Sequence, residues 1–169
     1  GVRMAINLAA QQLRQESLPS LVRGALSCYD LAPEDIELEI TESTAMQNPE
    51  ATIQILEKLA AMGIVLAIDD FGTGYSSLAY LKHLPIHRLK LDRSFVQDIN
   101  SNPDDAAICS ATVVLGHNLG LEIVAEGVET EAQRDLLHNL GCDVLQGFLY
   151  SRPLPAEEVV AFIRRHANP

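Results

Sequence analysis

Two adjacent aspartates, Asp69 and Asp70, are the residues of this sequence whose chemistry most directly suggests a cation site. They follow the apolar run 64–68 (IVLAI), which predicts a strand buried on both faces. Gly72 and Gly74 come next, in a loop whose backbone can adopt angles that other residues avoid. Two carboxylates at the end of a buried strand repel each other and are costly to desolvate, and a bound cation would offset both effects. The alternative is that Asp69 begins a turn and Asp70 caps a neighbouring element.

Further oxygen-bearing side chains lie near the ends of other apolar segments. Asn7, Glu39 and Glu126, together with the two aspartates, form a donor set without sulfur or imidazole. Carboxylate and amide oxygens of this kind suit Mg²⁺ or Mn²⁺. The histidines are scattered, and the sequence has neither a CxxC nor an HExxH pattern, which argues against zinc. Adjacent acids can serve two ions, as in sites that activate water and stabilise a phosphoryl leaving group.

Lys90 interrupts the apolar segment 88–91 (RLKL) with a positive charge. A cation beside acids could orient an attacking water or neutralise charge on a phosphate. The alternative is that Lys90 is a barrel residue whose aliphatic stem packs while its amine reaches solvent.

The elements that must position these residues alternate regularly between strands and helices. The expected strands are 2–8, 36–41, 64–68, 87–91, 122–125 and 143–145. The expected helices are 18–29, 48–62, 76–82, 104–118, 130–139 and 156–167. On helix 18–29 we expect Leu21, Val22, Ala25, Leu26 and Cys28 to share one side. Six βα units predict a parallel sheet with helical crossovers.

A polar residue lies at or near the carboxyl end of each of the six expected strands, which favours a barrel over an open sheet. These residues are Asn7, Glu39, Asp69, Lys90, Glu126 and Gln146. In a barrel all strand ends converge on one mouth, whereas an open sheet gathers them only near its switch point. A (β/α)8 barrel usually needs about 250 residues, and this chain has 169. We therefore expect one α/β domain over residues 1–169, an incomplete (β/α)8 TIM-type barrel of about six units that lacks its N-terminal strands.

Composition and charge indicate which classes of partner the protein can bind and in which compartment it is expected. A net charge of −11 argues against long nucleic acids and anionic membranes, which require a basic patch. No apolar run approaches the roughly 20 residues of a membrane helix, and the chain opens on a strand-like segment rather than a signal peptide. We interpret the three cysteines as buried free thiols in a reducing compartment. A cytoplasmic location is expected.

Six segments together resemble the EAL-domain phosphodiesterases of cyclic di-GMP. They are NLAAQQL (7–13), ELEITES (37–43), AIDDFGTGYSSL (67–78), IHRLKLDRSFV (86–96), IVAEGVET (123–130) and QGFLYSRPLP (146–155). The resemblance implies a distorted (β/α)8 barrel that hydrolyses cyclic di-GMP to linear pGpG with two Mg²⁺ or Mn²⁺ ions.

The resemblance also implies a role for individual residues. The metal ligands would be Asn7, Glu39, Asp69, Asp70 and Glu126. The catalytic set would be Lys90, Glu129, Gln146 and Glu42, the last acting by pinning the DDFGTG loop. The substrate-binding residues would be Asp92, Gln146 and Pro153. For Glu42 and Glu129 the alternative is a carboxylate that simply favours the start of a helix.

One departure keeps other functions open. The Glu-Ala-Leu signature of the family and the strands that carry it are not in this sequence. A non-catalytic cyclic di-GMP receptor or interaction module is therefore an alternative. An enolase-like barrel with a strand-end lysine base is another. The resemblance further implies a homodimer formed through barrel-side helices such as 104–118. It also implies an upstream sensor or GGDEF-type domain and, for some members, a membrane anchor.

Overall fold

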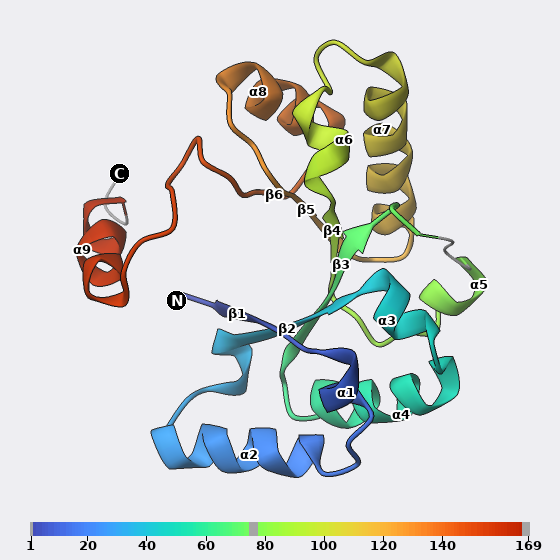
Figure 1. The fold of residues 1–169 in the computed structure, drawn as a ribbon, viewed down its shortest axis with the longest axis vertical. Coiled ribbons are helices and arrows are strands. Elements are labelled where there is room, and N and C mark those ends of the chain that lie inside the picture. Colours follow the sequence, from blue (N-terminus) through green and yellow to red (C-terminus); the bar gives the residue numbers. More distant parts are fainter. Residues whose placement is uncertain (1, 75–77, 167–169) are drawn as a thin grey trace.

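The computed structural model of the chain describes residues 2–74 and 78–166, and the expected helices 76–82 and 156–167 each extend partly outside them. Within the described residues, six parallel strands form one sheet whose spatial order follows the chain, β1 to β6 (Figure 1). The strands are β1 Met4–Asn7, β2 Ile36–Thr41, β3 Val65–Phe71, β4 Arg88–Leu91, β5 Glu122–Ala125 and β6 Val144–Leu145. This order has no reversal, whereas a doubly wound open sheet reverses at its switch point. The sheet is therefore of the barrel type.

The helices lie between successive strands, except α9, which follows β6. They are α1 Ala10–Leu13, α2 Leu18–Tyr29, η1 Pro33–Asp35 (a 3₁₀ turn), α3 Glu42–Met46, α4 Pro49–Ala60, α5 Leu78–Leu81, α6 Arg93–Gln97, α7 Pro103–Asn118, α8 Glu131–Leu140 and α9 Ala156–His166. The longer helices confirm the predicted ones within two residues at each described end. The sequence reading missed α1, η1, α3 and α6, because elements of three to five residues are too short to show a helical period.

Strand β3 forms the centre of the core. Ile64, Leu66 and Ile68 are fully buried, as predicted for this segment, and Leu56 and Leu59 of α4 are buried with them. Burying each such side chain contributes about 1.5–3 kcal/mol. Helix α4 ends before Gly63, whose φ of 91° lies in the left-handed region that favours glycine.

Strand β3 differs from the prediction because it continues past residue 68 through both aspartates to Phe71. The register with β4 shifts between Ile68 and Phe71, which is the mark of a bulge, and pairing resumes where Phe71 meets Leu91. The aspartates therefore lie within a distorted strand end rather than in the following loop.

The expected inner face of α2 is wrong in part. Val22 and Leu26 are partly buried against the core, whereas Leu21 is 64% exposed and Ala25 and Cys28 are also exposed. Successive residues are about 100° apart around a helix, so the stripe through Val22 and Leu26 turns Leu21 and Cys28 toward solvent. The prediction of a buried thiol is consequently wrong for Cys28, although Cys109 and Cys142 are buried.

Strand β1 and helix α9 lie at the periphery of the fold. Strand β1 is at one edge of the sheet, with Met4 and Ile6 exposed. Helix α9 is set apart from the other helices at the end of an extended segment (Figure 1). Among the described helices, none combines the length and the apolar character needed to cross a bilayer.

Candidate metal and active site at the carboxyl edge of the sheet

The register of the sheet places the six predicted strand-end residues on one face. Paired residues in neighbouring strands point the same way, and side chains alternate along each strand. The pairs that connect the strands are Asn7–Glu39, Glu39–Ala67, Ala67–Arg88, Lys90–Val124 and Val124–Val144. The other four site residues each follow one of these paired residues by two positions: Asp69 follows Ala67, Lys90 follows Arg88, Glu126 follows Val124 and Gln146 follows Val144. The whole predicted set, Asn7 and Glu39 included, therefore shares one face at the carboxyl edge.

Lys90 connects three of the predicted metal ligands. Its Nζ lies 2.6 Å from Glu39 Oε1, 2.7 Å from Glu126 Oε1 and 3.2 Å from Asp69 Oδ1. The lysine side chain is only 4% exposed, so its ammonium donates to carboxylates instead of reaching solvent. A buried charge requires this kind of compensation. The alternative of a packing lysine whose amine reaches water does not fit this geometry.

The environment shifts the pKa of Lys90 and Glu126 upward. Burial alone would lower the pKa of Lys90, but hydrogen bonds to Glu126 and Glu39, with the charges of Glu126 and Asp69, raise it overall. Burial raises the pKa of Glu126, and the charges of Asp69 and Glu39 add to this, although Lys90 opposes them. The ammonium is thus firmly protonated, while the acids around it carry unrelieved repulsion.

Asp69, Asp70 and Glu126 have the geometry of a cation site. One oxygen from each lies within 4.8 Å of the others. Asp70 adopts a φ of 55°, a left-handed conformation that costs a residue with a Cβ about 1–2 kcal/mol. Burial and the charge of Asp69 raise the pKa of Asp70. The carboxylates of Glu39, Asp69, Asp70 and Glu126 outnumber the ammonium of Lys90 by three charges. This excess of hard oxygen donors fits divalent Mg²⁺ or Mn²⁺.

Glu42 contacts the loop that the sequence predicts it to hold. Its side chain is buried at the start of α3, and Oε2 accepts a hydrogen bond of 3.0 Å from the backbone N–H of Gly72. Gly74 also faces this carboxylate: a Cβ added there would lie 3.5 Å from Glu42 Oε1. Glu42 therefore ties the loop after β3 to the end of β2.

Three other predicted residues, Asp92, Glu129 and Gln146, line one pocket of about 320 Å³ beside the acids, together with Asp70 and Glu126. Asp92 also caps α6, since Oδ1 accepts from the backbone N–H of Ser94 at 2.9 Å. Burial would raise the pKa of Asp92, but its hydrogen bonds with Ser94 lower it overall. The pocket thus joins the predicted metal ligands to the predicted substrate residues.

Pro153 and Asn7 lie further out. Pro153 lines an open pocket that adjoins the one beside the acids, since Gln146, Gly147 and Phe148 line both. Asn7 lies at the exposed end of β1, level with Glu39 but outside the ion pairs of Lys90.

Four residues that line the pocket beside the acids were not predicted from the sequence: Arg93, Gly127, Gly147 and Phe148. Arg93 is the cation among the acids that line the pocket. The ring of Phe148 lies beneath the guanidinium of Arg152, 4.8 Å from its carbon, and is half exposed. Arg93 and Phe148 lie in the segments DRSF and QGF, which carry the resemblance to the family. Neither of these two residues interrupts an apolar run as Lys90 does, so the apolar pattern did not single them out.

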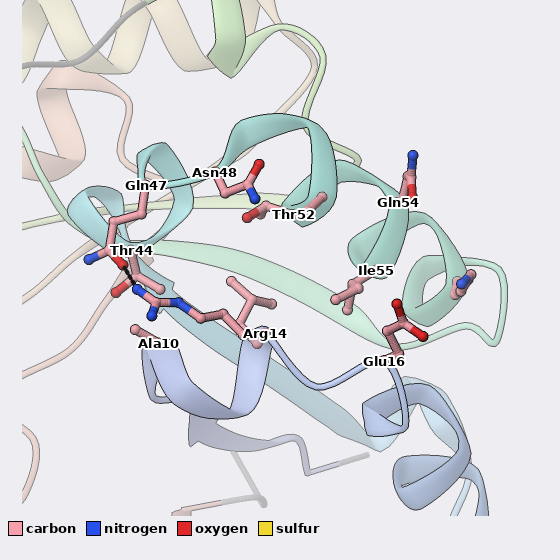
Figure 2. A pocket seen from close by; sticks show the side chains of 12 residues that line it. Ala10, Arg14, Glu16, Thr44, Gln47, Asn48, Thr52, Gln54 and Ile55 are labelled. Carbon is pink, nitrogen blue, oxygen red and sulfur yellow. Dashed lines mark hydrogen bonds between the residues drawn. The ribbon is translucent and has the colours of Figure 1, made fainter.

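Another pocket, of about 360 Å³, lies between α1 and α4 and is lined by none of the predicted site residues (Figure 2). Arg14 crosses it to reach Gln47, with Nη2 2.6 Å from Oε1. It lacks the acid cluster, so the carboxyl edge remains the candidate site.

Comparison with known proteins shows what this chain is similar to. The family model described as the EAL domain matches residues 1–153. The bifunctional diguanylate cyclase/cyclic di-GMP phosphodiesterase MucR of Pseudomonas aeruginosa is 54% identical over 160 residues, which cover 95% of this chain and 23% of MucR. Among the first curated relatives that it matches, the chain spans between 19% and 41% of their length.

The fold of this chain resembles that of solved structures over most of its length. The PaMucR phosphodiesterase in complex with c-di-GMP superposes with a TM-score of 0.89 at 55% identity, covering 93% of this chain and 64% of that one. Klebsiella pneumoniae BlrP1, in a manganese complex with cyclic di-GMP, gives a TM-score of 0.83 at 34% identity, covering 89% of this chain and 39% of that one. The expected incomplete TIM-type barrel is thereby confirmed.

Proposed function

Because the chain belongs to the EAL domain family, we propose that it forms part of a barrel that hydrolyses cyclic di-GMP to linear pGpG. The observation that carries the proposal is the contact of Lys90 with Glu39, Asp69 and Glu126 at a strand edge that also holds Asp70. A phosphodiester needs such a combination of hard donors and a fixed positive charge. MucR, which is named a cyclic di-GMP phosphodiesterase, supports the choice of substrate.

In this proposal Asn7, Glu39, Asp69, Asp70 and Glu126 hold two Mg²⁺ or Mn²⁺ ions. When bound, the ions would supply a more acidic water and neutralise charge on the phosphate. The manganese complex of BlrP1 with cyclic di-GMP supports the choice of metal. Each donor is a hard oxygen at the carboxyl edge of the sheet, and hard oxygens are the ligands that such ions prefer.

The remaining residues position the water and the substrate. Lys90 is protonated, so it donates hydrogen bonds and offsets phosphate charge rather than accepting a proton. Gln146 and Glu129, which face the same pocket, orient the attacking water. Water adds to one phosphorus, one P–O bond of the ring breaks, and the released oxygen takes a proton. Asp92 and Pro153 contact the rest of the dinucleotide.

We further propose that residues 1–169 belong to a single barrel domain completed by strands on the N-terminal side of β1. The exposed edge of β1, with Met4 and Ile6 open to solvent, supports this. A homodimer, an upstream sensor or GGDEF-type domain and a cytoplasmic location, free or membrane-anchored, complete the proposal.

The test is hydrolysis of cyclic di-GMP by the full-length protein with Mg²⁺ or Mn²⁺, followed by chromatography of pGpG. We expect product only when an ion is present, and none from Glu39→Gln. The matched control is Glu37→Gln, because Glu37 is equally buried in the same strand but bonds Arg88, 2.7 Å away, instead of Lys90. If the unaltered protein made no pGpG, the proposal that it hydrolyses cyclic di-GMP would be refuted. Calorimetric binding of cyclic di-GMP without turnover would instead establish the receptor alternative.

A further inference from the structure

The side chain of Gln133, in the first turn of α8, uses both ends of its amide. Its Oε1 accepts from the backbone N–H groups of Glu129 at 2.8 Å and Thr130 at 2.9 Å. Its Nε2 donates to the carbonyl oxygens of Val96 at 3.2 Å and Gln97 at 3.0 Å. The residue is only 7% exposed, so water cannot readily replace these four bonds.

These bonds join the two walls of the pocket beside the acids. Glu129 and Thr130 end the loop that begins at Glu126 and leads from β5 to α8. Val96 and Gln97 end α6, whose first residue, Arg93, also lines this pocket. Gln133 thus joins the two segments that line this pocket, the loop 126–130 and α6.

Helix capping explains only half of this arrangement. Thr130 and Gln133 form a capping box, in which the side chain at the third helical position accepts from the N-cap backbone. A glutamate would serve this purpose equally well. A glutamate carboxylate cannot donate, however, so the bonds to the carbonyls of Val96 and Gln97 require the amide nitrogen.

The walls touch closely enough for a small movement to matter. Gly127 has a φ of 71°, and a Cβ added to it would lie 2.6 Å from Cβ of Arg93. A shift of about 1 Å at a catalytic group can lower a rate on the order of 100-fold.

We infer that Gln133 is a positioning residue, which fixes the loop bearing Glu126 and Glu129 against α6 and so sets the spacing of the pocket. The inference rests on the proposed function for its effect on catalysis. The bridge itself is a property of the fold and can be measured without turnover.

The test compares Gln133→Glu with Asn100→Ala in the full-length protein. Gln133→Glu retains the cap of α8 and removes the bridge to α6. Asn100→Ala removes an exposed bond of 3.2 Å, from Nδ2 to the carbonyl of Ala132, which joins α8 to the segment after α6 without reaching the pocket. We expect Gln133→Glu to raise the Mn²⁺ concentration for half-maximal rate about 10- to 100-fold. Asn100→Ala should change it less than about twofold.

Half-saturation by Mn²⁺ does not depend on the fraction of enzyme that is folded, so it separates positioning from mere loss of stability. A Gln133→Glu variant that lowers only the maximal rate would overturn the inference. Hydrogen exchange of segment 126–130 is the second readout. Faster exchange in Gln133→Glu than in Asn100→Ala supports the bridge, and equal exchange overturns it. If the unaltered protein makes no pGpG, the proposed function fails, while the exchange comparison still decides the role of Gln133.

Discussion

Replacing Lys90 with methionine tests the electrostatic basis of the site most directly. Methionine keeps an unbranched apolar stem and removes the ammonium that contacts Glu39, Asp69 and Glu126 at 2.6–3.2 Å. These side chains are largely buried, so solvent compensates little for the lost charge. Removing one partner of a buried ion pair typically costs about 3–5 kcal/mol. This is a large share of the about 5–15 kcal/mol that stabilises an ordinary domain.

The assay is urea unfolding of the unaltered and Lys90→Met proteins at neutral pH, with EDTA and then with Mn²⁺. In EDTA we expect the variant to lose about 3–5 kcal/mol of unfolding free energy. The loss should shrink toward pH 4, because protonation of the carboxylates relieves their repulsion. Mn²⁺ should stabilise the variant, by about 2.7 kcal/mol at 100 times its dissociation constant. Hydrolysis should fall about 100-fold or more.

The matched control is Lys82→Met, at an exposed lysine outside the site. It should change the unfolding free energy by no more than about 0.5 kcal/mol. If Lys90→Met proved as stable as the unaltered protein in EDTA, the carboxylates would not be jointly ionised around Lys90. The assignment of this cluster as a cation site would then be wrong.

Three further predictions concern the surroundings of the cluster. Glu42→Ala removes the hydrogen bond to the Gly72 amide and should lower kcat more than it weakens cyclic di-GMP binding. Steady-state kinetics and calorimetry would measure the two effects, and equal losses would contradict the role of Glu42 in holding the loop. Gly147→Ala would bring a Cβ within 2.1–2.7 Å of the backbone of Val128, so it should lower both the thermal midpoint and the hydrolysis rate, and an unchanged midpoint would exclude this clash. Because the pKa of Glu126 is raised in the folded protein, its contribution to stability is present below its ordinary pKa of 4.5 and is lost as pH rises through the raised value. Urea unfolding in EDTA should therefore show Glu126→Gln gaining stability relative to the unaltered protein as pH rises above 4.5, and a parallel pH dependence of the two proteins would refute the shift.

Much of the fold is local in origin and therefore legible in the sequence. The run 64–68 and the glycine at 63 predict a buried strand after a helix, because side-chain period and backbone freedom are properties of neighbouring residues. The short helices α1, α3 and α6 escaped because one turn contains no repeat. Helix α2 shows a further limit. Its apolar residues cover more than one stripe, and only packing against the core selects Val22 and Leu26 over Leu21.

For the candidate site, residue type alone predicts which chemistry is available. Carboxylates at Glu39, Asp69, Asp70 and Glu126 indicate a divalent cation, provided that the fold brings them together. Only the tertiary structure decides that Lys90 lies among them, that Pro153 lines the adjoining pocket and that Gln133 joins α8 to α6. These relations depend on sheet register, on the bulge in β3 and on contacts between segments more than 30 residues apart. No local pattern of residues encodes such distances, because they arise only when the strands pair.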